Sequence, residues 1–108
     1  MSSPQQPQQP SMDEMMKQIQ EIQRVIQEMQ AQFVKQEFKS ETGGGLITVK
    51  ALGSKEVLSV ELRPEAIDED DPEMLDDLVL TAVNKLFKDI DDTFELEMSK
   101  ITRGFGIA

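Results

Sequence analysis

The stretch TGGGLITVKAL, Thr42 to Leu52, decides how this chain folds. Its three consecutive glycines suit a tight turn, because glycine takes positive φ angles without steric cost. The apolar and β-branched residues that follow predict a strand. A second turn at Gly53-Ser54-Lys55 and the alternating segment 57–62 add a hairpin. With a further strand over 34–41, residues 34–63 are predicted to form a three-stranded antiparallel meander.

Both faces of this predicted sheet carry apolar residues. Strict alternation directs one set toward the core: Val34, Phe38, Ile47, Val49, Leu58, Val60 and Leu62. The opposite set is Leu46, Leu52 and Val57. The helices of the chain can cover one face, and a second copy of the chain would cover the other. We therefore expect a homodimer.

Two amphipathic helices flank the predicted sheet. In the first, over 12–33, the spacings of 3 and 4 define a heptad seam of Met12, Met15, Ile19, Ile22, Ile26, Met29 and Phe33. Ile19, Ile22 and Ile26 are predicted to pack in the core or against a second copy. The second helix begins after Asp71, a predicted N-cap, with Pro72 in the first position, and runs to about residue 102.

The second helix has an apolar stripe that is broad early and narrow late. We expect its first half to be buried and its second half to project, beyond about Ile90, beside the first helix as an arm. The alternative is that both helices line one globular core.

The order of these elements resembles the YbaB/EbfC family of bacterial nucleoid-associated proteins. The segments that carry the resemblance are Gly44–Val49, Val57–Pro64, Asp71–Val79 and Ala82–Lys88, with a weaker echo over Met98–Gly104. The resemblance implies an α+β fold, α-β-β-β-α, in which two long helices project as the arms of a homodimer. It also implies binding of double-stranded DNA through those arms, with a location in the cytoplasm, at the nucleoid.

The chain is predicted to form one domain behind a short tail. Residues 1–11 are almost entirely Pro, Gln and Ser and carry no charge, which is typical of a disordered tail. Residues 12–106 form the domain for dimerisation and DNA binding. The chain has no cysteine and no histidine, so a thiol nucleophile and the usual zinc ligands are missing. We expect no enzyme activity, cofactor, metal, membrane partner or small-molecule substrate.

Charge restricts where DNA could bind. The net charge is −10, whereas nucleic-acid-binding domains are usually basic. Eight carboxylates and no basic residue lie between Pro64 and Asp77, a run that suits the start of a helix and solubility better than a site. The predicted DNA contacts are Lys17, Arg24, Lys100 and Arg103. The last two lie beside Gly104-Phe105-Gly106, which is expected to be flexible.

Antiparallel helices would bring these four cations together near an arm tip, and a dimer would double their number. Phosphate contacts of this kind give binding with low sequence specificity. For each cation, an ordinary solvated helix surface is the alternative. A second function also fits the fold, because seven methionines can form an adaptable apolar surface. That alternative is a non-enzymatic protein-interaction adaptor or chaperone-like module.

Overall fold

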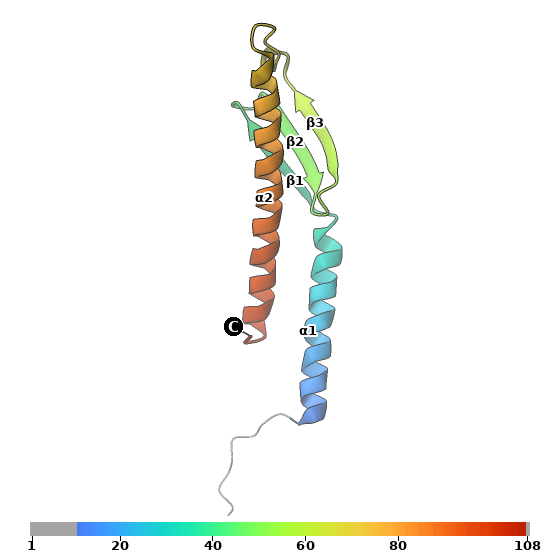
Figure 1. Cartoon of the computed structure of the whole chain (residues 1–108). Helices are drawn as coiled ribbons and strands as arrows, with labels where there is room; N and C mark the ends of the chain where they lie inside the picture. The colour runs from blue at the N-terminus through green and yellow to red at the C-terminus, as the bar shows by residue number, and fades with distance from the viewer. Residues whose placement is uncertain (1–10, 108) are drawn as a thin grey trace, which may run out of the picture.

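The computed structural model describes residues 11–107 as a helix, a three-stranded sheet and a second long helix (Figure 1). The elements are α1 (Met12–Phe33), β1 (Glu37–Thr42), β2 (Ile47–Leu52), β3 (Val57–Leu62), the 3-10 helix η1 (Pro64–Ala66) and α2 (Pro72–Gly104). Both strand pairs are antiparallel, in the order β1-β2-β3. The predicted α+β fold, α-β-β-β-α with a meander, is confirmed. The predicted tail lies outside the described residues, apart from Ser11.

Side-chain caps fix the start of both helices. The Ser11 hydroxyl accepts a hydrogen bond from the Glu14 backbone N–H at 3.2 Å, so Ser11 belongs to α1. At α2, the Asp71 carboxylate accepts from the Met74 N–H at 3.3 Å, and Pro72 takes the first helical position. The cap and the proline of α2 are therefore as predicted.

The first strand begins at Glu37 rather than at Val34. Val34 closes α1 instead, because its N–H donates to the Gln30 carbonyl at 3.1 Å and a short turn follows. Val34 is consequently 42% exposed and does not enter the core. Phe38 does pack against the core as expected, with its ring centroid 5.4 Å from that of Phe33.

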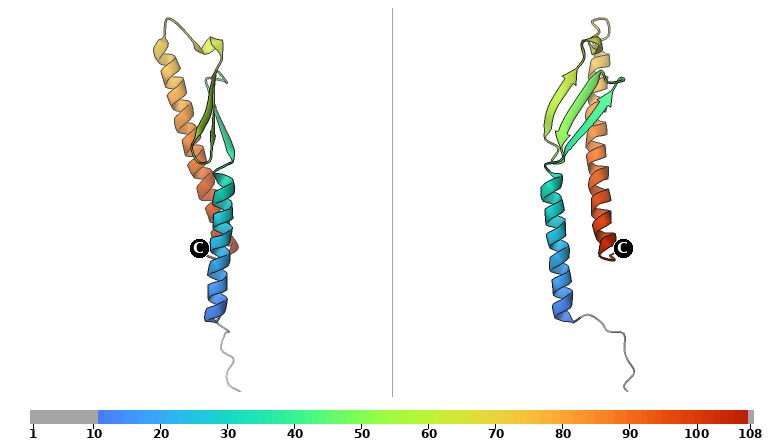
Figure 2. Two further views of the ribbon diagram at one scale, coloured as in Figure 1. Left: turned by 90° about the vertical axis from the view of Figure 1, so that its right-hand side faces the viewer. Right: turned by 180° about the vertical axis from the view of Figure 1, so that it is seen from behind.

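The core lies between α2 and the first two strands (Figure 2). Its innermost side chains are Ile47, Val49 and Ala51 of β2, and Ala82, Leu86 and Ile90 of α2. They recur with period two on the strand and at steps of four on the helix, as one strand face packed on one helix face requires. The expectation that the first half of α2 is its buried half is confirmed.

The third strand is left largely uncovered, because α2 packs over β1 and β2. Val60 pairs with Val49, and Leu62 pairs with Ile47, so both share the face of the core. Yet Val60 is 45% exposed and Leu62 is 43% exposed. Val60 and Leu62 thus point to the core side as expected but stay exposed in the single chain, whereas Leu58, 46% exposed, does not enter the core.

A bulge in β3 also changes which way Val57 points. The register shifts between Lys50 and Ala51, so that Val57 pairs with the buried Ala51 while Leu58 is the extra residue. Val57 therefore shares the core side of the sheet, whereas strict alternation had placed it on the opposite side. Together with Val60 and Leu62 it forms the "open β3 face", defined by these three residues.

The second half of α2 and α1 form an arm that projects from the sheet (Figures 1 and 2). The two helices run antiparallel, and the rings of Phe33 and Phe94 meet edge to face with centroids 5.3 Å apart. The projecting arm is as predicted, and the arrangement excludes the alternative of one globular core. The beginning of α1 extends well past the end of α2 (Figure 1).

Candidate nucleic-acid interface

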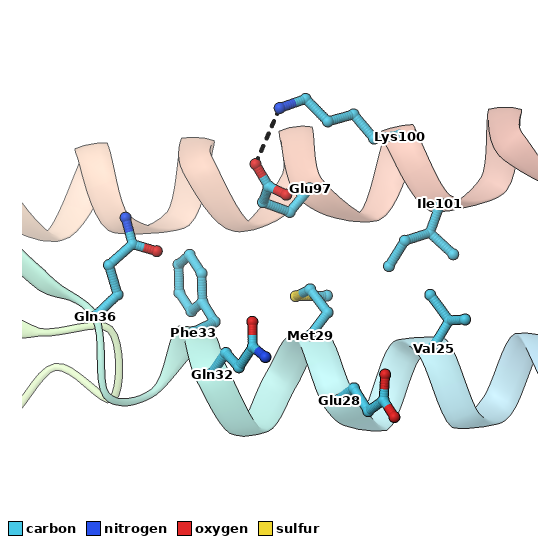
Figure 3. Close-up of a pocket in the computed structure, with 9 residues that line it drawn as sticks. All are labelled: Val25, Glu28, Met29, Gln32, Phe33, Gln36, Glu97, Lys100 and Ile101. Carbon is cyan, nitrogen blue, oxygen red and sulfur yellow. Dashed lines mark hydrogen bonds and ion pairs between the residues drawn. The ribbon is translucent and has the colours of Figure 1, made fainter.

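An open cleft of about 390 Å³ lies between the two helices of the arm. Figure 3 shows Val25 of α1 and Ile101 of α2 pointing toward one another, with Met29 beside them. Lys100 points outward, and its Nζ lies 3.1 Å from Glu97 Oε1. The floor of the cleft thus continues the apolar packing of the helices, and its charged groups lie at the rim.

A glycine cap orders the end of α2, where Arg103 lies. The Gly106 N–H donates to the Arg103 carbonyl at 3.0 Å, and the Ile107 N–H donates to the Thr102 carbonyl at 2.7 Å. With φ of 72° at Gly106, this is the Schellman pattern that ends many helices. The segment from Gly104 to Gly106, expected to be flexible, is an ordered helix end. Arg103 in the last turn also complements the helix dipole.

Arg24 is held by carboxylates of its own helix. Its Nη1 donates to Glu28 Oε1 at 2.7 Å, and its Nε donates to Glu21 Oε2 at 3.0 Å. Hydrogen bonding by Arg24 holds the pKa of the Glu21 carboxyl below its usual range, and hydrogen bonds to Glu21 and Glu28 raise the pKa of the guanidinium. All three side chains are exposed, so the ion pairs are screened by water. The carboxylates of Glu21 and Glu28 nevertheless offset the charge that Arg24 could offer to a phosphate.

The spacing of charges along the sequence already indicates these ion pairs. Glu21 precedes Arg24 by three residues, and Glu28 follows it by four. Glu97 likewise precedes Lys100 by three. Oppositely charged residues at these spacings meet on a helix surface. Within residues 11–107, by contrast, Lys17 and Arg103 take part in no ion pair.

The four predicted contacts lie on the arm but do not form one cluster within a chain. Ile101 of α2 faces Val25, in the middle of α1, so the end of α2 does not reach the start of α1. Lys17 lies seven residues before Arg24, about 10 Å further along the helix. Lys17 and Arg24 also lie almost opposite the seam of α1, and Arg103 almost opposite the packed side of α2. The cations therefore occupy opposite outer sides of the arm.

The residues predicted for the dimer or core are all partly accessible in the single chain. Leu46 packs against the edge of the core, and Leu52 is half-buried. Val57 is 42% exposed on the open β3 face, and Ile19 on α1 is 49% exposed. Ile22 and Ile26 are half-buried. None of the six is fully buried by its own chain.

The densest run of acidic residues lies at the other end of the molecule, whereas the carboxylates of the arm are spread along its two helices. The loop that holds Asp68 to Asp71 leads into the start of α2, beyond the sheet (Figure 1). The 33 residues of α2 then separate this end from Arg103 by about 50 Å. Among residues 11–107 no cluster of three or more acidic side chains has the geometry to hold a metal ion. None of the described helices is long and apolar enough to span a membrane.

Comparison with known proteins places the chain among DNA-associated proteins. The YbaB/EbfC DNA-binding family matches residues 8–105. A nucleoid-associated protein of Clostridium novyi is 43% identical over 82 residues, which cover 76% of this chain and 72% of that protein. A nucleoid-associated protein of Listeria innocua is 44% identical over 78 residues, covering 72% of this chain and 74% of the relative.

A solved structure shares the fold at much lower sequence identity. The crystal structure of an uncharacterized protein from Helicobacter pylori superimposes with a TM-score of 0.70 at 13% identity. The superposition covers 86% of this chain and 98% of that one. It supports the arrangement of sheet and helices and carries no information on function.

Proposed function

This chain belongs to the YbaB/EbfC DNA-binding family, and from that premise we propose that it is a homodimeric, nucleoid-associated protein that binds duplex DNA through its helical arms with low sequence specificity. The observation that carries the proposal is the arm itself. It projects from the sheet (Figure 1), and it carries Lys17 on α1 and Arg103 at the end of α2, two cations that form no ion pair within residues 11–107. We place the protein in the cytoplasm, at the nucleoid.

The position of the densest acidic run favours contact through the arm rather than through the sheet end, although the arm also has four carboxylates against two cations in each of 12–33 and 91–104. The run of carboxylates around Asp71 would repel phosphates from the far end of α2. Arg103 lies about 50 Å from it, beyond several Debye lengths at physiological salt. DNA would therefore meet the arm first and the acidic loop last.

The small number of free cations supports low specificity and modest affinity. Lys and Arg contacts to phosphates position a protein on DNA but do not read its sequence. Two unpaired cations in each arm give about four in a dimer, and each phosphate contact adds about 0.9 to the salt slope of log K. The expected binding is weak, steeply dependent on salt and nearly independent of base sequence.

The open β3 face supports the homodimer. Val57, Val60 and Leu62 are each more than 40% exposed, and β3 is an edge strand. An exposed apolar edge strand invites pairing with other chains unless it is covered. A second copy that packs on this face would bury it and set two arms on one body.

Duplex binding over a series of salt concentrations tests the proposal, with fluorescence anisotropy of a labelled DNA of about 30 base pairs. We compare the native chain with the double variant Lys17→Gln and Arg103→Gln. The matched control is Lys35→Gln and Lys85→Gln, which removes the same charge away from the arm end. If the arm binds phosphates, the first variant loses most of the affinity and its salt slope falls by about 2 or more, while the control binds like the native chain.

Equal weakening by both variants would mean that net charge alone attracts the DNA. Binding that is unchanged in the arm variant would overturn the assignment to Lys17 and Arg103. The alternative function, a protein-interaction adaptor, is favoured by the exposed methionines of α1. An adaptor would bind its partner through apolar contacts that persist at moderate salt, and it would show no saturable DNA binding at low salt.

A further inference from the structure

The turn between β2 and β3 holds a lysine in a backbone conformation that favours glycine. We call Gly53-Ser54-Lys55 the β2–β3 turn. Lys55 has a φ of 70°, and within residues 11–107 it is the one residue other than glycine with a positive φ. Its N–H donates to the Leu52 carbonyl at 2.8 Å, and the Leu52 N–H donates to the Glu56 carbonyl at 2.9 Å. The left-handed position of such a hairpin loop usually holds glycine, because a Cβ strains it. A lysine there costs stability, so the contacts of its side chain have to explain it.

The Lys55 side chain reaches across to α2. Its Nζ lies 2.8 Å from Asp91 Oδ1 and 5.9 Å from the centroid of the Phe87 ring. Phe87 and Asp91 are four residues apart, so both lie on the same side of the helix. Phe87 itself packs against the core, which gives the lysine a fixed surface to rest on. One side chain thus joins the turn to α2.

No other ion pair of the described chain makes a connection of this kind. Within residues 11–107, the remaining ion pairs lie inside one helix, inside one strand or between neighbouring strands. An exposed ion pair contributes little to stability by itself. The importance of this one therefore lies in the segments that it joins.

The backbone of the same turn is docked on the end of α1, as the ribbon in Figure 1 shows. The Gly53 N–H donates to the Gln36 carbonyl at 2.8 Å, and the Ser54 N–H donates to the Val34 carbonyl at 3.3 Å. A Cβ on Gly53 would lie 2.0 Å from the Phe33 carbonyl oxygen, so the two backbone segments are in direct contact. The β2–β3 turn is thus attached to α1 through its backbone and to α2 through Lys55.

We propose that Lys55 is a positioning residue, which holds the β2–β3 turn against α2 and thereby fixes the direction of α1 relative to α2. The contact of Phe33 with Phe94 would act as the pivot, since an open cleft separates the helices further along the arm. A small rotation there is amplified along α1, whose free end lies about 30 Å away. The distance between Lys17 and Arg103 depends on this angle. The consequence for DNA rests on the proposed function, whereas the angle itself does not.

Double electron–electron resonance between two spin labels tests the proposal on the full chain, which has no cysteine of its own. Gln20→Cys on α1 and Glu95→Cys on α2 carry the labels at exposed positions. An excess of unlabelled, cysteine-free chain ensures that a labelled copy in a dimer has an unlabelled partner. An arm held in one direction gives a narrow distribution of distances.

Removing either partner of the ion pair should release the arm. Lys55→Gln and Asp91→Asn should each broaden the distribution, and the double variant should broaden it no further, because both changes remove the same contact. Lys55→Arg keeps the charge and should keep the distribution narrow. The matched controls are Lys88→Gln and Asp92→Asn, which remove the same charges from an ion pair within α2. Both controls should give the native distribution.

Lys55→Gly separates positioning from formation of the turn. Glycine relieves the left-handed strain, so the melting temperature should stay at or above that of the native chain. The distance distribution should nevertheless broaden, as in Lys55→Gln. A lysine that served the turn alone would leave the distribution narrow in Lys55→Gly, and that result would overturn the proposal.

Three other results would also contradict it. A native distribution in Lys55→Gln would show that the arm is held without the lysine. Broadening in Lys55→Gln but not in Asp91→Asn would reject the ion pair as the cause, and equal broadening in Lys88→Gln would assign the effect to net charge. Failure of the proposed function is distinguishable, because the label distances are measured without DNA.

Discussion

The two halves of α2 lie in contrasting surroundings. The part up to Ile90 presses Ala82, Leu86 and Ile90 against β2, where they are almost completely buried. The second half faces α1 across an open cleft, and Ile101 there stays partly exposed. One continuous helix therefore serves as a core element at one end and as half of an arm at the other. The comparison indicates that the sheet end provides most of the stability, while the arm is available for binding.

The densest run of acidic residues also lies at the sheet end of α2. The sheet end of α2 starts beside a dense acidic loop, and the arm end finishes with Arg103 in an ordered glycine cap. Surfaces that bind partners must remain exposed, so an arm of this kind contributes less buried area than a core of the same length. Three experiments, with five substitutions in all, test how sharp the division is, from the largest expected effect to the smallest.

The largest expected effect comes from truncating the same residue type at two sites on α2. Leu86 is fully buried, so Leu86→Ala should lower the free energy of unfolding by about 3 kcal/mol. Leu80 is 60% exposed on the same helix, and Leu80→Ala should cost less than about 1 kcal/mol. Urea unfolding followed by circular dichroism measures both. Similar losses at the two sites would mean that Leu80 is covered in solution, for instance by a second copy.

A smaller effect is expected where the sheet joins the arm. A Cβ on Gly53 would lie 2.0 Å from the Phe33 carbonyl oxygen at the end of α1, so one backbone segment must move. Gly53→Ala should cost about 2 kcal/mol or more. Gly44 has a φ of 69° but open space around it. Gly44→Ala should therefore lower the free energy of unfolding only by the strain of an alanine in the left-handed backbone region, about 1 kcal/mol. Thermal unfolding of the two variants ranks their losses of stability. A smaller loss for Gly53→Ala than for Gly44→Ala would show that the backbone between the sheet and the arm can move at little cost.

The smallest effect concerns an ion pair of the arm. Arg24 lowers the pKa of Glu21 in the folded chain, so the pair contributes stability above the unfolded pKa of about 4.3 and loses it as the pH falls through the lower folded value. Glu21→Gln should therefore lower the melting temperature slightly at pH 6, and the difference from the native chain should shrink as the pH falls below the unfolded pKa. A difference that does not change with pH would assign the effect to helix propensity rather than to charge.

Local patterns predicted most of the fold. The glycine turn, the Asp71 cap with Pro72 and the heptad seam of α1 each depend on neighbours in sequence, and each is found in the structure. The first strand was placed three residues early because Val34 suits a strand as well as a helix end. The ion pairs of Arg24 with Glu21 and Glu28 were also readable from their spacing.

The candidate site could be predicted less completely. Sequence placed Lys17, Arg24, Lys100 and Arg103 on the two helices, but not their positions relative to one another. Those positions depend on where the end of α2 lies along α1, which the length of the sheet and its turns determine. The open β3 face was missed for two reasons. Sequence does not show that α2 leaves β3 uncovered, and the bulge at Leu58, which moves Val57 to the core side of the sheet, is not visible in the alternation of apolar residues.

The sequence by itself determined the number, type and order of the elements, since turn chemistry, caps and hydrophobic periodicity act within a few residues. It also determined the excess of acid and its concentration before α2. Only the tertiary structure decided which strand α2 leaves open and which part of the α1 seam extends beyond its partner. Both follow from how far each element reaches in space, a quantity that depends on packing between segments distant in the chain.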